Sequence, residues 1–271
     1  MTNEKDYVLG THDAEVERLG LQHSVWRPRA SLAWRRGGFT RGQTLIDVGC
    51  GPGYAAVDLA GIVGPEGRVL ALDRSRRFLD VVEHAAKTRG LPQIEAIECD
   101  LDETRWPDAV ADGAWSRWVY AFVRDPRAVL SRVAQRLRPG GVMVLHEYVD
   151  YRAWRLSPRS SDFEDFVSEV ILSWRESGGE PDIALELPRW LKELDFDVVG
   201  LEAISEVARP ADFMWQWPKA FFTVGLERLV ELGRVEAKRA QAMRAAFDGA
   251  EQTPGTFMIT PTVLEIVARK R

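Results

Sequence analysis

Short apolar runs alternate with helical patterns between residues 44 and 150, and this alternation constrains the fold more than any other feature of the chain. The first and last runs are almost continuously apolar, which is typical of strands buried on both faces of a parallel sheet. The pattern therefore predicts a doubly wound α/β sheet. Its strands are expected at residues 45–48, 69–72, 94–99, 114–119 and 142–146.

Two helices between these strands carry clear end signals. Ser75 can cap a helix whose apolar positions follow the i, i+3, i+4, i+7 spacing from Phe78. Asp125 and Pro126 open a second helix, and the Pro139-Gly140-Gly141 turn stops it. These signals define the alternating units of the sheet.

The rest of the chain flanks this core. A helical pattern over residues 12–36 is broken by Pro28. Later segments predict helices near 161–177 and 183–194, a strand near 197–206, helices over 210–250 kinked by Pro218, and a strand at 262–268. No linker demands a second domain, so we expect a single domain over residues 1–271. Its parts are cap helices (1–40), a ligand-binding core (41–150) and a C-terminal sheet edge (151–271).

Composition disfavours several classes of protein. The formal net charge of −5 weighs against non-specific nucleic-acid binding. The two cysteines, Cys50 and Cys99, have no metal-ligand spacing, so we expect neither a disulfide framework nor a metal site. The polar N-terminus and the lack of a long apolar run predict a soluble, cytoplasmic protein without a membrane partner.

A glycine-rich loop, Gly49-Cys50-Gly51-Pro52-Gly53, follows the first predicted strand and is introduced by Asp47. Glycines at such a turn let a ligand touch bare backbone at a helix N-terminus. The spacing is G-x-G-x-G, and Tyr54 stands where the dinucleotide fingerprint has its third glycine. The Asp47 carboxylate would repel a pyrophosphate and suits a cation. The loop therefore favours a cationic ligand without phosphates, such as S-adenosylmethionine (SAM).

The stretch 45–53 resembles the first motif of class I SAM-dependent methyltransferases. Asp73, 24 residues after Gly49, resembles the acidic residue that holds both ribose hydroxyls in this family. Cys99-Asp100-Leu101 resembles the position that reads adenine, and residues 137–141 resemble the turn before the fifth strand. The resemblance covers residues 44–148 and implies a Rossmann-like, seven-stranded sheet that binds SAM and releases S-adenosylhomocysteine (SAH). The cofactor-binding residues that we assign in this stretch are Asp47, Gly49, Cys50, Gly51, Asp73, Arg74, Asp100, Leu101 and Arg117.

The N-terminal lead carries a second resemblance. Tyr7-Val8-Leu9-Gly10, followed by Glu17-Arg18-Leu19 and Gln22, is similar to the lead of a small-molecule subset of these enzymes. That subset includes ubiquinone/menaquinone C-methyltransferases and natural-product methyltransferases. The resemblance implies that Tyr7 and Gln22 close over the cofactor.

Missing motifs and abundant tryptophan narrow the acceptor. Residues 117–120 read Arg-Trp-Val-Tyr, not the Asn/Asp-Pro-Pro-aromatic motif of enzymes that methylate amide or exocyclic amine nitrogens of nucleic acid and protein. No Pro-Cys dipeptide supplies the nucleophile of cytosine methylation, and no Asp/Asn set resembles the magnesium site of catechol O-methyltransferases. Aromatic walls suit a flat, apolar acceptor and a sulfonium. Six of the ten tryptophans support this reading: Trp118, Trp154, Trp174, Trp190, Trp215 and Trp217.

The exit of the fifth strand supplies candidate bases. His146 is the first choice, because imidazole titrates near neutral pH, and Glu147 and Tyr151 are further candidates. Since side chains alternate along a strand, His146 and Glu147 should point to opposite faces, one of them toward the site. His23 lies on the apolar face of the first helix and is expected to be a hydrogen-bonded core residue.

Residues 207–255 are far longer than the turn that a hairpin between the last two strands needs. Their first helix carries five large aromatics, so we predict a helical lid over the site, with Pro218 setting its bend. The aromatics that would form the acceptor pocket are Phe213, Trp215, Trp217, Phe221 and Phe222. A homodimer interface is the alternative use of these aromatics. Two other functions also stay open: a SAM-binding enzyme of the same fold that promotes cyclisation, and a nucleic-acid methyltransferase, which the charge and the missing motifs disfavour.

Overall fold

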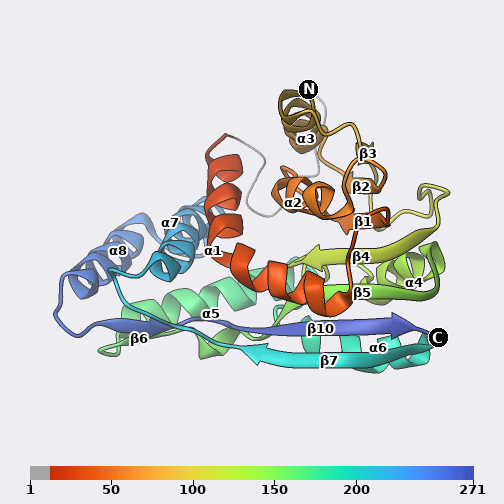
Figure 1. The fold of residues 1–271 in the computed structure, drawn as a ribbon. Coiled ribbons are helices and arrows are strands. Elements are labelled where there is room, and N and C mark those ends of the chain that lie inside the picture. The colour runs from red at the N-terminus through yellow and green to blue at the C-terminus, as the bar shows by residue number, and fades with distance from the viewer. Residues whose placement is uncertain (1–12) are drawn as a thin grey trace.

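The computed structural model describes residues 13–271, and a seven-stranded sheet forms the centre of the described chain (Figure 1). The strand order is β3-β2-β1-β4-β5-β10-β7. Strands β1 to β5 are parallel, while β10 runs antiparallel to both of its neighbours. The predicted doubly wound sheet is confirmed. The strands are β1 (Thr44–Val48), β2 (Arg68–Asp73), β3 (Ile94–Glu98), β4 (Ala111–Arg117), β5 (Leu137–Asp150), β7 (Phe196–Ile204) and β10 (Thr262–Lys270).

Helices cover both faces of this sheet. Apolar residues of α1 (Asp13–Gly37) and α2 (Tyr54–Val63) pack with β1 and β5 side chains on one face. Residues of α4 (Pro126–Arg136) and α6 (Leu187–Glu193) pack on the other. The α3 helix (Arg76–Arg89) begins at Ser75, whose hydroxyl accepts a hydrogen bond from the Phe78 N–H, and Asp125 caps α4 through the Ala128 N–H, as predicted.

Two proline signals have a different effect from the one we expected. The α1 helix continues through Pro28 and changes direction instead of breaking (Figure 1). Pro218 is the third residue of α7 (Gln216–Glu231), where a missing N–H costs no intrahelical hydrogen bond, so it lies at the start of the helix and not in its middle. The turn at residues 139–141, which we expected to end the preceding helix, lies inside β5, because α4 already ends at Arg136. The strand pairing is irregular there: Ala111 of β4 pairs with Leu137, and Gly113 pairs with Val142.

The C-terminal part adds helices and a second sheet beside the first. A three-stranded sheet, β6-β9-β8, was not predicted, because its strands are only two or three residues long. The three strands are β6 (Arg155–Ser157), β8 (Val207–Ala208) and β9 (Phe257–Ile259). The further helices of this part are α5 (Ser161–Glu176), α8 (Ala237–Glu251) and the short 3-10 helices Tyr151–Ala153, Ile183–Leu185 and Phe213–Trp215. Both α7 and α8 lie between β7 and β10 in sequence, and α7 packs against α1.

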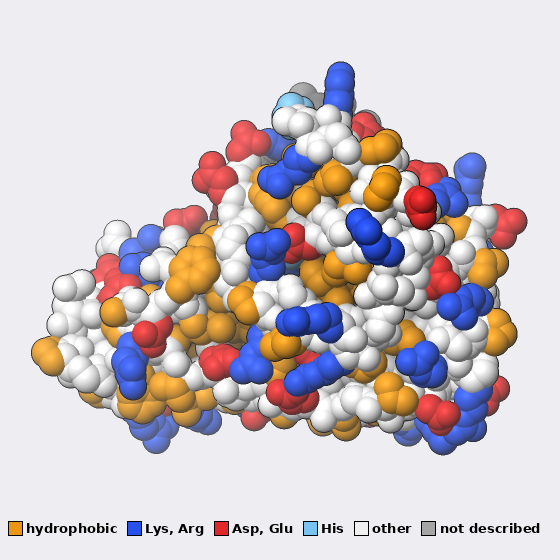
Figure 2. All heavy atoms as spheres, viewed as in Figure 1, with side chains coloured by type: hydrophobic (Ala, Val, Ile, Leu, Met, Phe, Trp, Pro, Cys, Tyr) orange, Lys and Arg blue, Asp and Glu red, His pale blue; other side chains and the backbone are white. Residues whose placement is uncertain are grey.

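The surface carries charges of both signs. Figure 2 shows Lys and Arg side chains interspersed with Asp and Glu over the face in view, with no continuous basic track. Within residues 13–271, no helix combines the length and the apolar character that crossing a bilayer requires.

Candidate functional site

A cavity of about 1100 Å³ opens where β1, β2, β3 and β4 end. Its walls come from these strand ends, from the loops that follow them and from the first turns of α1. Ligands of open α/β sheets bind in this position, outside the carboxyl ends of the strands. The cavity has a polar end beside the glycine loop and an aromatic end beside α5 and α7.

The glycine loop brings backbone to the polar end of the cavity. Gly49 has a φ of +63°, and a Cβ there would lie 2.7 Å from Val119 Cγ2. Gly51 has a φ of +52°, and the nearest atom to a Cβ there would be Leu19 Cδ1 at 3.9 Å. Gly49 is thus needed for close packing, whereas the space above Gly51 is free for a ligand.

Asp73 joins this loop to the start of α3. Its Oδ2 accepts a hydrogen bond from the Gly51 N–H at 2.9 Å, and its Oδ1 accepts one from the Ser75 N–H at 2.8 Å. Burial raises the pKa of this carboxyl. Each carboxylate oxygen has a second lone pair, so the pair can still accept two hydrogen bonds from a diol.

Two groups of opposite charge, the buried Asp47 and the partly buried Arg117, face the middle of the cavity. Asp47 is 2% exposed, and burial raises its pKa to about 7. Burial also lowers the pKa of Arg117 to about 10, and the guanidinium lies over the rings of Trp115 and Trp118 at 5.9 and 5.3 Å. No hydrogen bond or ion pair joins these two described residues, and among residues 13–271 Asp47 Oδ2 and Arg117 Nη1 have no hydrogen-bond partner. Both charges can therefore still bind a ligand.

His23 holds Arg117 from the α1 side. Its Nδ1 lies 3.2 Å from Arg117 Nη2, and its Nε2 lies 3.0 Å from Asp58 Oδ2. The histidine is hydrogen-bonded and buried, as predicted, but it also lines the cavity. Sequence reasoning missed this role, because Asp58 and Arg117 lie 35 and 94 residues away in the chain.

The other proposed cofactor residues also line the cavity, apart from Tyr7, which lies outside the described residues. Gln22 accepts a hydrogen bond from Arg18, which pairs with Glu15. Asp100 Oδ1 accepts the Asp102 N–H at 3.0 Å, so the loop after β3 is held in place. The remaining residues of this set in the lining are Cys50, Arg74 and Leu101. Among residues 13–271, no group of three or more His, Cys, Asp or Glu side chains is arranged to hold a metal ion.

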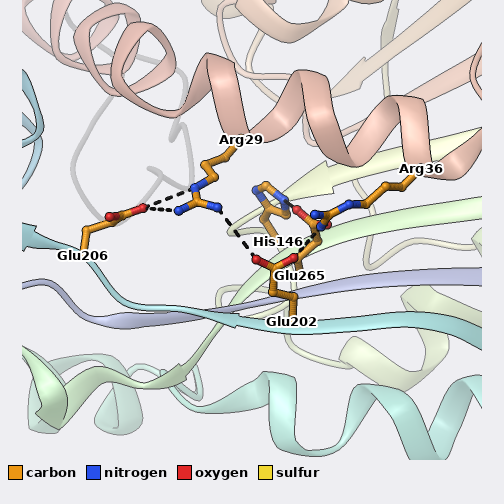
Figure 3. Close-up of polar contacts among 6 residues, drawn as sticks. All are labelled: Arg29, Arg36, His146, Glu202, Glu206 and Glu265. Atoms are coloured by element: carbon orange, nitrogen blue, oxygen red, sulfur yellow. Dashed lines mark hydrogen bonds and ion pairs between the residues drawn. The ribbon is translucent and has the colours of Figure 1, made fainter.

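His146, the first-choice base, lies outside the cavity lining. It is fully buried, its Nε2 lies 3.0 Å from Glu265 Oε2, and Trp26 and Trp115 pack on its ring. Figure 3 shows that Glu265 belongs to an ion-pair network between α1 and strands β7 and β10. Its members are Arg29, Arg36, Glu202, Glu206 and Glu265. The network anchors the second half of α1 to the sheet. His146 contacts this network through Glu265, so its role is structural.

Glu147 and Tyr151 also lie outside the lining, so the expectation that His146 or Glu147 faces the site is wrong. Glu147 is fully buried and its Oε1 accepts the N–H groups of Val119 and Tyr120 at 2.6 and 3.0 Å. Burial raises its pKa to about 8. It therefore fixes the loop after β4. The ring of Tyr151 packs against Tyr148, inside the aromatic cluster.

The aromatic end is built around Trp118, which has a φ of +54°. Such backbone is uncommon for a large side chain, and it persists only where the surroundings enforce it. The Trp118 ring is stacked between Tyr148 and Trp217, with centroids 5.2 and 5.4 Å away. The aromatic side chains that line this end are Trp118, Phe122, Tyr148, Trp174 and Phe221.

The aromatics of residues 207–255 have two different placements. Trp217 and Phe221 on α7 lie beside the strand end that carries Arg117, and both are buried within this single chain. Phe213, counted among the pocket aromatics, is 58% exposed, because it precedes the helix in a short 3-10 turn.

Comparisons with known proteins agree with this architecture. A family model described as "Methyltransferase domain" matches residues 46–145. A demethylmenaquinone methyltransferase of Geobacillus stearothermophilus is 32% identical over 197 residues, covering 71% of this chain and 82% of that protein. The O-methyltransferase cnsE of Penicillium expansum is 28% identical over 196 residues, covering 72% of this chain and 64% of that protein.

Two further comparisons concern a relative that is matched only in part and a solved structure of similar fold. The chain spans only 30% of a 37.1 kDa protein encoded in a Streptomyces fradiae transposon, with 36% identity over 39% of this chain. Among solved structures, the mycolic acid cyclopropane synthase CmaA1, complexed with SAH and CTAB, superposes with a TM-score of 0.59. At 16% identity, with 90% of this chain and 83% of that chain covered, the likeness shows the fold alone.

Proposed function

Because the chain belongs to the class I SAM-dependent methyltransferases, we propose that it methylates an aromatic or otherwise apolar small molecule. It is a small-molecule methyltransferase that uses SAM, and the identity of the acceptor is the part we infer. The observation that carries this inference is the aromatic end of the cavity, which adjoins the polar cofactor end. Flat apolar ligands gain most from such walls, through area burial and ring stacking.

The polar end fits SAM in three respects. Asp73 keeps lone pairs for the two ribose hydroxyls, and Gly51 leaves its backbone open to the ligand. Asp47 and Arg117 present opposite charges to the ammonium and the carboxylate of the amino-acid group. Asp100 and Leu101 line the wall on which adenine would lie. When bound, SAM supplies a methyl group on a positively charged sulfur. The sulfur is an already activated leaving group, because it departs as the neutral thioether of SAH.

The chain's own contribution is alignment and exclusion of water. The aromatic side chains of this end would together orient a flat acceptor, and the buried setting of Trp118, Tyr148 and Trp174 keeps water from the reacting atoms. His146, Glu147 and Tyr151 do not touch the cavity, so none of them is placed to take a proton from the acceptor. The α7 helix closes this end, which supports a lid role for residues 207–255 over a role in dimerisation.

Two neighbouring phenylalanines of α7 give a matched test of the acceptor site. Phe221 lines the cavity, whereas Phe222 is equally part of the core but packs on Phe166 and Phe247 away from it. The enzyme is incubated with methyl-labelled SAM and a metabolite extract. We expect labelled product from the wild type, a loss of at least fivefold with Phe221→Leu, and little change with Phe222→Leu. SAM affinity, measured by calorimetry, should be the same in all three.

Two outcomes would contradict the proposal. If both variants lose label incorporation equally, the aromatic end of the cavity is not the acceptor site. If the extract is converted without any label in the product, the chain promotes a non-methylating reaction such as cyclisation.

A further inference from the structure

A chain of four polar side chains runs from the protein surface to the middle of the cavity. Arg27 donates two hydrogen bonds to Asp58, at 2.7 and 2.9 Å. Asp58 contacts His23, and His23 contacts Arg117. The four residues come from three elements: α1 supplies Arg27 and His23, α2 supplies Asp58, and the end of β4 supplies Arg117. We call this chain the Arg27–Arg117 relay.

The chemistry of the relay fixes the tautomer of His23. A guanidinium can only donate hydrogen bonds, so Nδ1 of His23 must accept from Arg117. The ring proton is then on Nε2, where it is donated to Asp58 Oδ2. Burial lowers the pKa of His23 and so favours this neutral form. Hydrogen bonds from His23 and Arg27 lower the pKa of Asp58 to about 2, although burial opposes this, so Asp58 stays charged.

The relay affects the separation between the Asp47 carboxylate and the Arg117 guanidinium. The charges of Asp47 and Arg117 attract each other across the cavity, yet no hydrogen bond or ion pair joins these two described residues. The Arg117 side chain is instead hydrogen-bonded to His23, on the α1 side. A direct ion pair between Asp47 and Arg117 would fill the space that a ligand's amino-acid group needs.

We propose that His23 is a positioning residue: held by Asp58, it keeps the Arg117 guanidinium away from Asp47, so that the two charges receive the opposite ends of SAM's amino-acid group. The proposal rests on the cofactor placement given above. It assigns to α1 a role in recognising the amino-acid part of the cofactor, separate from the recognition of adenosine by Asp73 and Asp100.

Comparing two ligands isolates this role. SAH carries the amino-acid group, whereas 5′-methylthioadenosine has the same adenosine and sulfur without it. Calorimetry measures both affinities for the wild type, His23→Leu and His23→Asn. His23→Leu removes the acceptor for Arg117, and we expect it to weaken SAH binding at least tenfold while methylthioadenosine binding stays within twofold. His23→Asn keeps an acceptor oxygen near the position of Nδ1 and should restore most of the SAH affinity.

The control is His84→Leu, the same substitution at an exposed position on α3, which should leave both affinities unchanged. Thermal unfolding of each variant verifies that it is folded. The proposal is overturned if His23→Leu weakens both ligands in parallel, if it weakens neither, or if His23→Asn is as poor as His23→Leu. Because no acceptor is present in these measurements, a negative result leaves the proposed acceptor site standing.

Discussion

The two ends of the cavity are built by different means. The shape of the polar end is set by backbone: the glycine loop, the N–H groups that hold the Asp73 carboxylate and the turn after β3. The aromatic end uses side chains from four separate segments, the loop after β4, β5, α5 and α7, packed against one another. Backbone geometry tolerates few residue types, whereas aromatic packing tolerates exchanges of similar volume. The first end is therefore suited to one fixed cofactor, and the second can be adapted to different acceptors.

Glycine substitutions should separate the two ends most clearly. Gly49→Ala at the polar end combines a positive φ with a Cβ 2.7 Å from Val119. We expect a loss of about 3 kcal/mol in the free energy of unfolding, from backbone strain and overpacking together. SAM affinity should fall by at least tenfold, because the loop must shift. Chemical denaturation and calorimetry measure the two effects.

Gly225→Ala at the aromatic end is the matched comparison. Gly225 lies inside α7, and a Cβ there would be 3.3 Å from the ring ends of Phe166 and Phe221. The gain in helix propensity, about 1 kcal/mol, offsets this contact, so we expect a net change within about 1 kcal/mol. Equal destabilisation by the two substitutions would show that the polar end is no more dependent on its backbone than the aromatic end.

The sequence predicted the polar end well because its signals are local. A strand followed by glycines and a carboxylate at a strand end each occupy a few consecutive residues, and Asp47, Asp73 and Asp100 all line the cavity. The doubly wound sheet followed from the alternation of strands and helices, and its seven strands and the β7–β10 pairing from the family resemblance. His146 was misplaced because strand alternation indicates a face but not what covers it. Here α1, through Trp26, lies against that face, and Glu265 pairs with the imidazole.

The loop after β4, which lies between the two ends of the cavity, should make the free energy of unfolding depend on pH. Glu147 holds Val119 and Tyr120, and its pKa is raised from 4.5 to about 8 by burial. The folded state thus keeps a proton on Glu147 that the unfolded state releases, so the contribution of Glu147 to stability is greatest below pH 4.5 and falls as pH rises toward 8. Between pH 5.5 and 8 this contributes at most about 3 kcal/mol, at 1.36 kcal/mol per unit.

Glu147→Gln tests this assignment. The amide keeps an acceptor oxygen for the two N–H groups and cannot ionise, so its unfolding free energy should vary less between pH 5.5 and 8 than that of the wild type. Glu231→Gln, at an exposed position on α7, is the control and should follow the wild type. If Glu147→Gln shows the full pH dependence, the loop is not the source of it.

The smallest effect that we expect is a pH dependence of SAM affinity, which arises at the polar end alone. Burial raises the pKa of Asp47 to about 7, so much of the ligand-free protein has a neutral Asp47 near neutral pH. The positively charged sulfonium and ammonium of SAM favour the ionised carboxylate, and binding must then release a proton. From pH 6 to pH 8 we therefore expect SAM affinity to rise by roughly tenfold, about 1.4 kcal/mol. Asp47→Asn should bind more weakly at pH 8 and show little pH dependence in calorimetric titrations. A wild-type affinity that stays constant over this range would mean that Asp47 is already ionised before SAM binds, and that the pair with Arg117 is stronger than the structure indicates.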